Sequence, residues 1–105
     1  MSIMFGRYYK LQGQSPIIAE SFLDWCLWMA SADTRVMVND IYNVNISTVF
    51  VGINLDPQQS GEPMIFETLV MGGVLDGKRN HWSTWEQAMQ GHLKICAQIS
   101  KLSAS

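Results

Sequence analysis

Two segments near the middle of the chain constrain its fold more than any other feature. Residues 47–54 (STVFVGIN) and 64–73 (MIFETLVMGG) are rich in β-branched and aromatic residues, and the loop between them carries Asp-Pro and Ser-Gly pairs. This pattern predicts the two strands of one hairpin. Alternation along the second strand places Met64, Phe66, Thr68 and Val70 on one side and Ile65, Glu67, Leu69 and Met71 on the other. Both sides are largely apolar, so each needs a cover, from this chain or from a partner.

The rest of the chain predicts two helices and two further strands. Residues 5–11 and 36–42 have strand character, residues 20–31 read as a helix, and the clearest helix begins near residue 84. The predicted order is β-α-β-β-β-α. We therefore expect an α+β fold in which both helices pack on one face of an antiparallel sheet of three to four strands. No linker or repeat divides the sequence, and residues 1–105 are predicted to form a single α+β domain.

The two predicted helices differ in pattern. Residues 20–31 are apolar almost all round, which predicts a helix buried on more than one side. The last helix, of about 18 residues, begins at a capping box formed by Thr84 with Gln87 or by Ser83 with Glu86. Gly91 within it costs about 1 kcal/mol relative to alanine, which indicates a close approach of this helix to the sheet.

The composition points to hidden apolar surface. Apolar residues make up 48% of the chain and charged residues only 15%, whereas about 25% is typical. Four tryptophans and seven methionines add residue types that are enriched where proteins meet proteins. We therefore expect a homo-oligomer, in the simplest case a dimer.

Charge and cysteine content limit the partners and the compartment. The seven basic residues are scattered and the formal net charge is −2, so we expect no nucleic-acid binding. No apolar run approaches the roughly 20 residues of a membrane span, and the N-terminal residues do not resemble a signal peptide. Cys26 and Cys96 are expected to be reduced thiols, which favours a cytoplasmic location.

Glu67 and His92 are the candidates for chemistry. Glu67, a lone carboxylate among apolar strand residues, could be a general base or a ligand-binding group. It could equally form an ion pair with Arg35 or Arg79, or lie at the rim of the sheet. His92 lies on the apolar stripe of the last helix. It is either an acid/base partner of Glu67 or a core histidine with hydrogen-bonded ring nitrogens.

No catalytic or cofactor motif supports an enzyme. The histidines and cysteines lack the spacing of metal ligands, Gly72 and Gly73 lack the lysine and helix of a phosphate loop, and no serine lies in a nucleophile elbow. We expect no metal and no cofactor.

Large side chains on the predicted sheet and beside the helices are the candidates for a protein interface. Tryptophan dominates binding hot spots, although core packing is the alternative for each ring. The candidate interface residues are Trp28, Phe50, Phe66, Met71 and Trp82.

Three segments in order resemble a known family. Residues 47–52 (STVFVG), 66–73 (FETLVMGG) and 83–92 (STWEQAMQGH) are similar to the STVFxG, FETMVFGG-like and TWEEAxxGH segments of a family of small, uncharacterised tailed-phage proteins. The resemblance covers roughly residues 30–95. Many relatives carry an Asp-His pair after the first of these strands, where this chain has GINLDP. The resemblance implies a phage or prophage origin and an accessory role.

The resulting functional expectation is stoichiometric binding. Small phage accessory proteins commonly bind and neutralise host machinery, so the leading hypothesis is inhibition of a host protein, such as a component of an anti-phage defence system, in the bacterial cytoplasm. One alternative is a sponge that holds a signalling nucleotide between subunits with Glu67, Arg35, Arg79 and an aromatic ring. Others are a small enzyme using Glu67 and His92, and a virion component.

Overall fold

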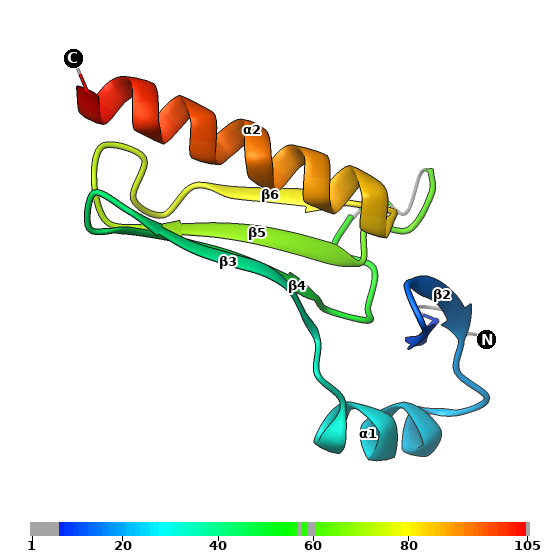
Figure 1. Ribbon diagram of the computed structural model, residues 1–105. Helices are drawn as coiled ribbons and strands as arrows, with labels where there is room; N and C mark the ends of the chain where they lie inside the picture. The colour runs from blue at the N-terminus through cyan, green and yellow to red at the C-terminus, as the bar shows by residue number, and fades with distance from the viewer. Residues whose placement is uncertain (1–6, 57, 59–60, 105) are drawn as a thin grey trace.

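The computed structural model describes residues 7–56, 58 and 61–104 and confirms the α+β class (Figure 1). A two-stranded antiparallel hairpin comes first, a four-stranded antiparallel sheet follows, and a helix lies after each of them. The elements are β1 (Tyr9–Gln12), β2 (Ser15–Ile18), α1 (Phe22–Ser31), β3 (Arg35–Ile41), β4 (Val44–Phe50), β5 (Phe66–Met71), β6 (Arg79–Trp82) and α2 (Trp85–Ala104). The predicted order lacked β2 and β6.

The four-stranded sheet is a meander in the order β3-β4-β5-β6, and α2 runs across one of its faces (Figure 1). Alternation decides which side chains this helix covers, because every second residue of β4 and β5 is buried. The buried residues of the covered face are Val44, Ile46, Thr48 and Phe50 from β4, and Phe66, Thr68 and Val70 from β5. The predicted division into two faces is confirmed within β5, where α2 covers the face that carries Phe66. It does not hold just before the strand, where Ile65 is buried in the same core as Phe66.

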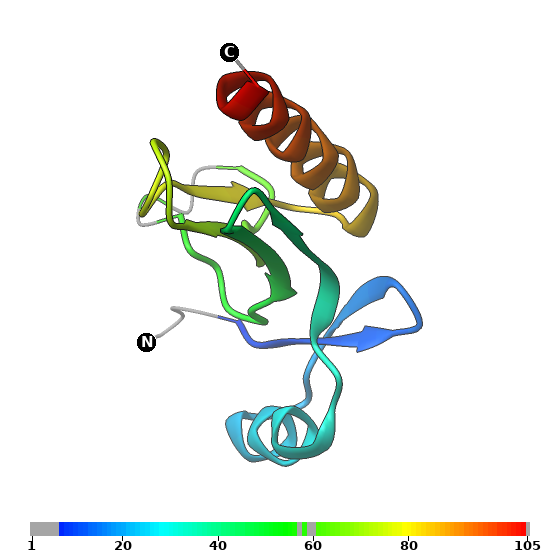
Figure 2. The same ribbon diagram turned by 60° about the vertical axis from the view of Figure 1, so that its left-hand side comes forward.

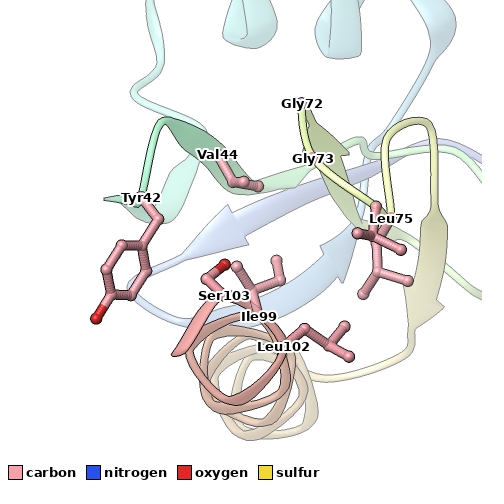
Figure 3. Close-up of a pocket in the computed structure, with 9 residues that line it drawn as sticks. Tyr42, Val44, Gly72, Gly73, Leu75, Ile99, Leu102 and Ser103 are labelled. Atoms are coloured by element: carbon pink, nitrogen blue, oxygen red, sulfur yellow. The ribbon is translucent and has the colours of Figure 1, made fainter. Parts of the chain in front are cut away.

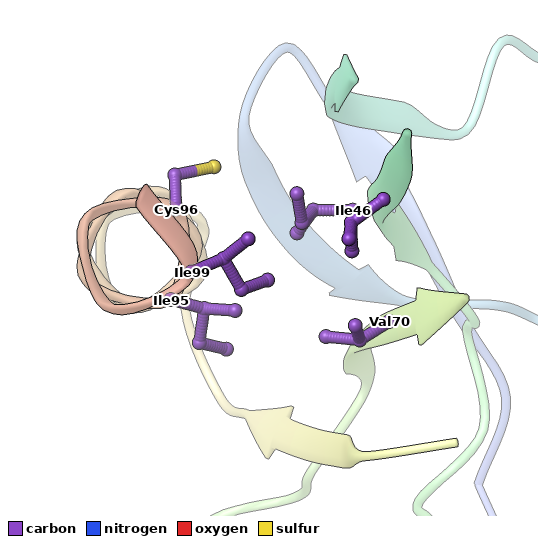
Figure 4. Close-up of a cluster of buried hydrophobic side chains, with 6 residues drawn as sticks. Ile46, Val70, Ile95, Cys96 and Ile99 are labelled. Atoms are coloured by element: carbon purple, nitrogen blue, oxygen red, sulfur yellow. The ribbon is translucent and has the colours of Figure 1, made fainter. Parts of the chain in front are cut away.

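The core between α2 and the sheet has two parts. Ile95, Cys96 and Ile99 of α2 pack on β4 and β5, as Figure 4 shows for Ile46 and Val70. The second part lies under the N-terminal half of α2 and is built around Phe50, Ile65, Phe66 and Ala88, with Tyr9, Leu11, Trp28 and Trp85 packed against it. The β1–β2 hairpin therefore belongs to the core at this end of the sheet.

The start of α2 follows the predicted cap. Thr84 is the capping residue, because the backbone N–H of Gln87 donates to its hydroxyl at 3.0 Å. The side-chain oxygen of Gln87 accepts in return from the backbone N–H of Ser83, at 3.1 Å. Gly91 lies against the indole ring of Trp82, and a Cβ at this position would overlap the ring. The expected close approach of α2 to the sheet is confirmed at Gly91.

The first helix departs from expectation. Both views show α1 beyond the end of the four-stranded sheet, on the side away from α2 (Figures 1 and 2). It covers neither face, so the two helices do not pack together on one face as predicted. No residue of α1 is buried, so the described chain does not provide the burial on more than one side that the sequence of this helix predicts.

Candidate functional site

His92 belongs to a chain of hydrogen bonds that crosses the covered face of the sheet from Trp82 to Asn39. The indole N–H of Trp82 donates to Thr68 Oγ1 at 3.0 Å, and the hydroxyls of Thr68 and Thr48 are 2.6 Å apart. Thr48 Oγ1 lies 2.7 Å from His92 Nδ1, and His92 Nε2 lies 2.8 Å from the side-chain oxygen of Asn39. All four strands contribute one member each.

The two ends of this chain fix the direction of its two terminal bonds. An indole N–H can only donate and an amide oxygen can only accept. His92 therefore carries a proton on Nε2, which donates to Asn39, and the neutral ring that burial favours accepts from Thr48 at Nδ1. Burial lowers the pKa of His92, because removing the ring from water disfavours its charged form. Both ring nitrogens of His92 have hydrogen-bond partners within the protein, as the interpretation of His92 as a core histidine predicts.

Burial of a neutral histidine makes the stability depend on pH. The pKa of His92 is lowered in the folded state relative to its ordinary value of 6.5, so the unfolded chain binds more protons as the pH falls through that value. We expect the free energy of unfolding to decrease as the pH is lowered from about 7.5 through 6.5, until the pH reaches the lower pKa of the folded state. Urea unfolding at half-unit pH steps measures the slope. The variant His92→Gln should lack it over this range, and an equal slope in both proteins would contradict the assignment.

Glu67 lies on the opposite face of the sheet from His92. Its Oε1 accepts from Arg79 Nη1 at 3.0 Å and its Oε2 lies 3.0 Å from His81 Nε2. The ion pair with Arg79 is one of the predicted alternatives, whereas Arg35 pairs with Asp33 at 3.0 Å. Because α2 covers the other face, Glu67 and His92 lie on opposite sides of the sheet and do not form the acid/base pair considered for an enzyme.

The face that carries Glu67 has no covering layer within the described part of the chain. Cross-strand register places Val38, Ser47, Leu69 and Arg79 in one row, with Met71 opposite Asn45 in the next. Val38 and Met71 are each about half exposed, at 46% and 52%. We call this surface the open face and define it by Val38, Asn45, Ser47, Val49, Glu67, Leu69, Met71, Arg79 and His81.

The candidate interface residues lie in different environments. Met71 is on the open face, as an interface residue would be. Phe50 and Phe66 are at most 1% exposed beneath α2, so their assignment as interface residues is wrong. Trp28 stacks edge-to-face on Phe50 with ring centroids 5.8 Å apart, and Trp82 is half-buried against Gly91. Period-2 alternation separates the two faces but does not tell which one the helix covers.

Sequence reasoning missed an exposed apolar stripe on α1. Leu23 and Leu27 are both 66% exposed and Phe22 is 57% exposed. The signal was present in the pattern, since a short helix without a polar face needs cover on every side. What the pattern cannot show is that the chain itself leaves one side of the helix uncovered.

The hollows along α2 include two that bear on ligand binding. The smaller, of about 130 Å³, lies at the C-terminal end of the helix and is mostly apolar, with Tyr42, Val44, Leu75, Ile99 and Leu102 among its lining residues (Figure 3). It is well below the roughly 300–1,000 Å³ of typical ligand sites. The larger is an open groove of about 600 Å³ between β6 and α2. Its lining includes the cations Lys78 and Lys94, which were not singled out from the sequence.

Comparisons with known proteins do not identify a function for this chain. No protein-family model, curated protein or solved structure matches this chain. Within residues 7–56, 58 and 61–104, no helix combines the length and the apolarity needed to cross a membrane. The same residues contain no group of three or more His, Cys, Asp or Glu side chains able to hold a metal ion.

Proposed function

We propose that this protein is a phage accessory protein that acts in the cytoplasm of its bacterial host by binding a host protein stoichiometrically. The proposed target is a component of an anti-phage defence system, in line with the resemblance to small tailed-phage proteins. The observation that supports binding is the open face, where a four-stranded sheet leaves Val38 and Met71 about half exposed. Exposed apolar surface on a folded sheet is typical of interaction sites.

The composition of the open face fits a partner that binds transiently. Its apolar residues lie beside the charged and polar cluster of Glu67, Arg79 and His81. Interfaces of non-permanent complexes have such a mixture, and they are about as apolar as the rest of the protein surface. The groups that suggested catalysis are already engaged, since Glu67 is paired and His92 is enclosed. This arrangement favours binding over chemistry.

A charge placed on the open face should abolish target binding. We expect Met71→Glu to weaken the complex by about 100-fold, because a carboxylate buried in an apolar contact without a partner costs on the order of 3 kcal/mol. Leu93→Glu on α2 is the matched control, since Leu93 is 53% exposed and Met71 is 52% exposed. Surface plasmon resonance with the captured host protein gives both affinities. Equal affinities for the two variants would exclude the open face as the site of target binding.

Stoichiometry separates inhibition by binding from inhibition by catalysis. Host proteins retained by the immobilised wild type, but not by Met71→Glu, are identified and then purified. Titration of the partner's activity with the phage protein should reach its end point at a fixed molar ratio. Complete inhibition by a small fraction of an equivalent would overturn the proposal in favour of an enzyme.

A specific observation also favours nucleotide sequestration as a second candidate. The groove between β6 and α2 is lined by Lys78, Lys94, His81 and four side-chain amides, and none of its described lining residues is a carboxylate. Lysines suit the phosphates of a nucleotide and amides suit the edges of its base. The residues first considered for this role are less suitable, because Arg35 and Arg79 are paired with carboxylates.

Thermal unfolding tests this second candidate. Cyclic nucleotides should raise the melting temperature of the wild type more than mononucleotides do, because a bound ligand stabilises the folded state. The double substitution of Lys78 and Lys94 by Gln should remove the shift, while Lys101→Gln, outside the groove, should retain it. Absence of any shift at millimolar nucleotide would exclude the sponge.

A further inference from the structure

The exposed side of α1 is a continuous apolar stripe without a charged residue. Phe22, Leu23, Cys26, Leu27 and Ala30 recur at intervals of one, three and four residues, which places them on one side of a helix. Phe22, Leu23 and Leu27 are more than half exposed, and Ala30 is exposed as well. We call these five residues the α1 stripe.

The helix cannot hide this stripe by turning about its axis, because both ends are held. Near the start, the ring of Trp25 packs on Tyr8 with centroids 5.1 Å apart. Near the end, Trp28 packs on Phe50 at 5.8 Å. Asp24, the one charged residue of α1, pairs with Lys10 at 2.9 Å and is thereby fixed beside β1. The orientation of the stripe towards solvent is thus set by contacts within the chain.

We propose that the α1 stripe binds the α1 stripe of a second copy, so that the two helices pack antiparallel across a two-fold axis. A charge-free apolar surface is typical of permanent homodimers, whereas the open face has the mixed composition of a transient interface. A two-fold contact requires a self-complementary surface, and a stripe that carries no charge meets its copy without like-charge repulsion. Antiparallel packing also places the two helix dipoles in opposition.

The area of the stripe is sufficient for such a dimer. Exposed fractions of 57% for Phe22 and 66% for Leu23 and Leu27 leave on the order of 100 Å² of apolar surface on each side chain. Since homodimer interfaces are about 65% apolar, an interface built on these residues would bury on the order of 500 Å² per copy. Both copies together then reach about 1,000 Å², the lower limit for a specific interface.

Light scattering coupled to size-exclusion chromatography tests the proposal. The wild type should have twice the 11.8 kDa mass of one chain, and Leu27→Glu should have the mass of one chain. Leu93→Glu, a comparably exposed leucine of α2, should remain a dimer, and circular dichroism verifies that each variant is folded. A monomeric wild type at every concentration, or a folded Leu27→Glu that remains a dimer, would overturn it.

Disulfide formation through Cys26 tests the antiparallel arrangement of the two helices directly. Cys26 lies between Phe22 and Ala30, four residues from each, so antiparallel packing about the middle of the stripe brings the two Cys26 residues together near the axis. A disulfide requires Cα atoms within about 7 Å, a distance that packed helices allow at their closest positions. Added diamide would oxidise the two thiols to one disulfide and be reduced itself by two electrons and two protons.

Oxidation should yield a covalent dimer in the wild type and in Cys96→Ser, but not in Cys26→Ser. Cys96 is buried beneath α2, which makes it the internal control. A dimer that diamide does not link through Cys26 would overturn the antiparallel arrangement. The open face shares no residue with the α1 stripe. The dimer test can therefore fail while target binding is retained, and target binding can fail while the dimer is retained.

Discussion

Replacement of His92 by alanine should lower the free energy of unfolding by about 3 kcal/mol. The substitution leaves the buried Thr48 hydroxyl without its histidine partner, a loss that costs about 1–3 kcal/mol, and it removes the hydrogen bond to the exposed residue Asn39. It also opens a cavity beneath α2, because the ring is completely buried. Domains of this size are stable by only 5–15 kcal/mol, so urea unfolding will resolve the loss readily.

His81→Ala is the matched control for this prediction. His81 also hydrogen-bonds through a ring nitrogen, to Glu67 at 3.0 Å, but its side chain is about one-third exposed on the open face. Removal of an exposed pair of this kind changes stability by at most about 1 kcal/mol. Equal losses of stability in the two alanine variants would contradict the assignment of His92 as a buried, hydrogen-bonded core residue.

Gly91→Ala should destabilise the protein by about 1 kcal/mol net, against the helix propensity of the two residues. In an open helix the exchange would stabilise by about 1 kcal/mol. Here the added methyl group overlaps the indole of Trp82, and that ring cannot move away freely because its N–H donates to Thr68. Overpacking of this kind costs about 1–3 kcal/mol.

A double-mutant cycle attributes the effect of Gly91→Ala to its cause. In the background Trp82→Leu, which removes the ring, the same exchange should be neutral or stabilising. Equilibrium unfolding of the four proteins gives the coupling energy between the two positions. A loss of stability that is equally large without the ring would show that Gly91 is needed for another reason.

The parts of the fold that were predictable are those set by local periodicity. Alternation in residues 47–54 and 64–73 is strong because both strands are central in the sheet. β5 lies within the second segment, whereas β4 overlaps the first only at residues 47–50 and begins earlier, at Val44. The spacing of apolar residues and the Thr84 cap predicted α2. The two missed strands are short and weak in pattern: β2 contains Pro16, and β6 is the polar edge segment RNHW.

The relation between the elements was not predictable, because it depends on long-range packing. The two faces of β5 are similarly apolar, so no local rule tells which of them α2 covers. Trp28 and Trp25 hold α1 at the end of the sheet instead of on it. Consequently the most apolar helix is the most exposed one, and the two phenylalanines chosen as interface residues lie in the core.

The polar chain below α2 was also missed, although a signal was present. Thr48 and Thr68 are directly paired across β4 and β5, at positions where the neighbouring residues of the same face are apolar. Hydroxyls at such positions need a partner, and His92 was the one buried polar group on the helix that could serve both the sheet and its edge strand. The sequence indicated the histidine but not the two threonines that orient it.

The central claim is that the exposed apolar surface of the open face, and not the buried hydrogen-bonded chain around His92, carries the function. The most direct test is the affinity of the captured host protein for Met71→Glu and for His92→Gln, measured at a temperature where both variants are folded. We predict wild-type affinity for His92→Gln and about 100-fold weaker binding for Met71→Glu. Loss of binding by His92→Gln together with wild-type binding by Met71→Glu would contradict the claim.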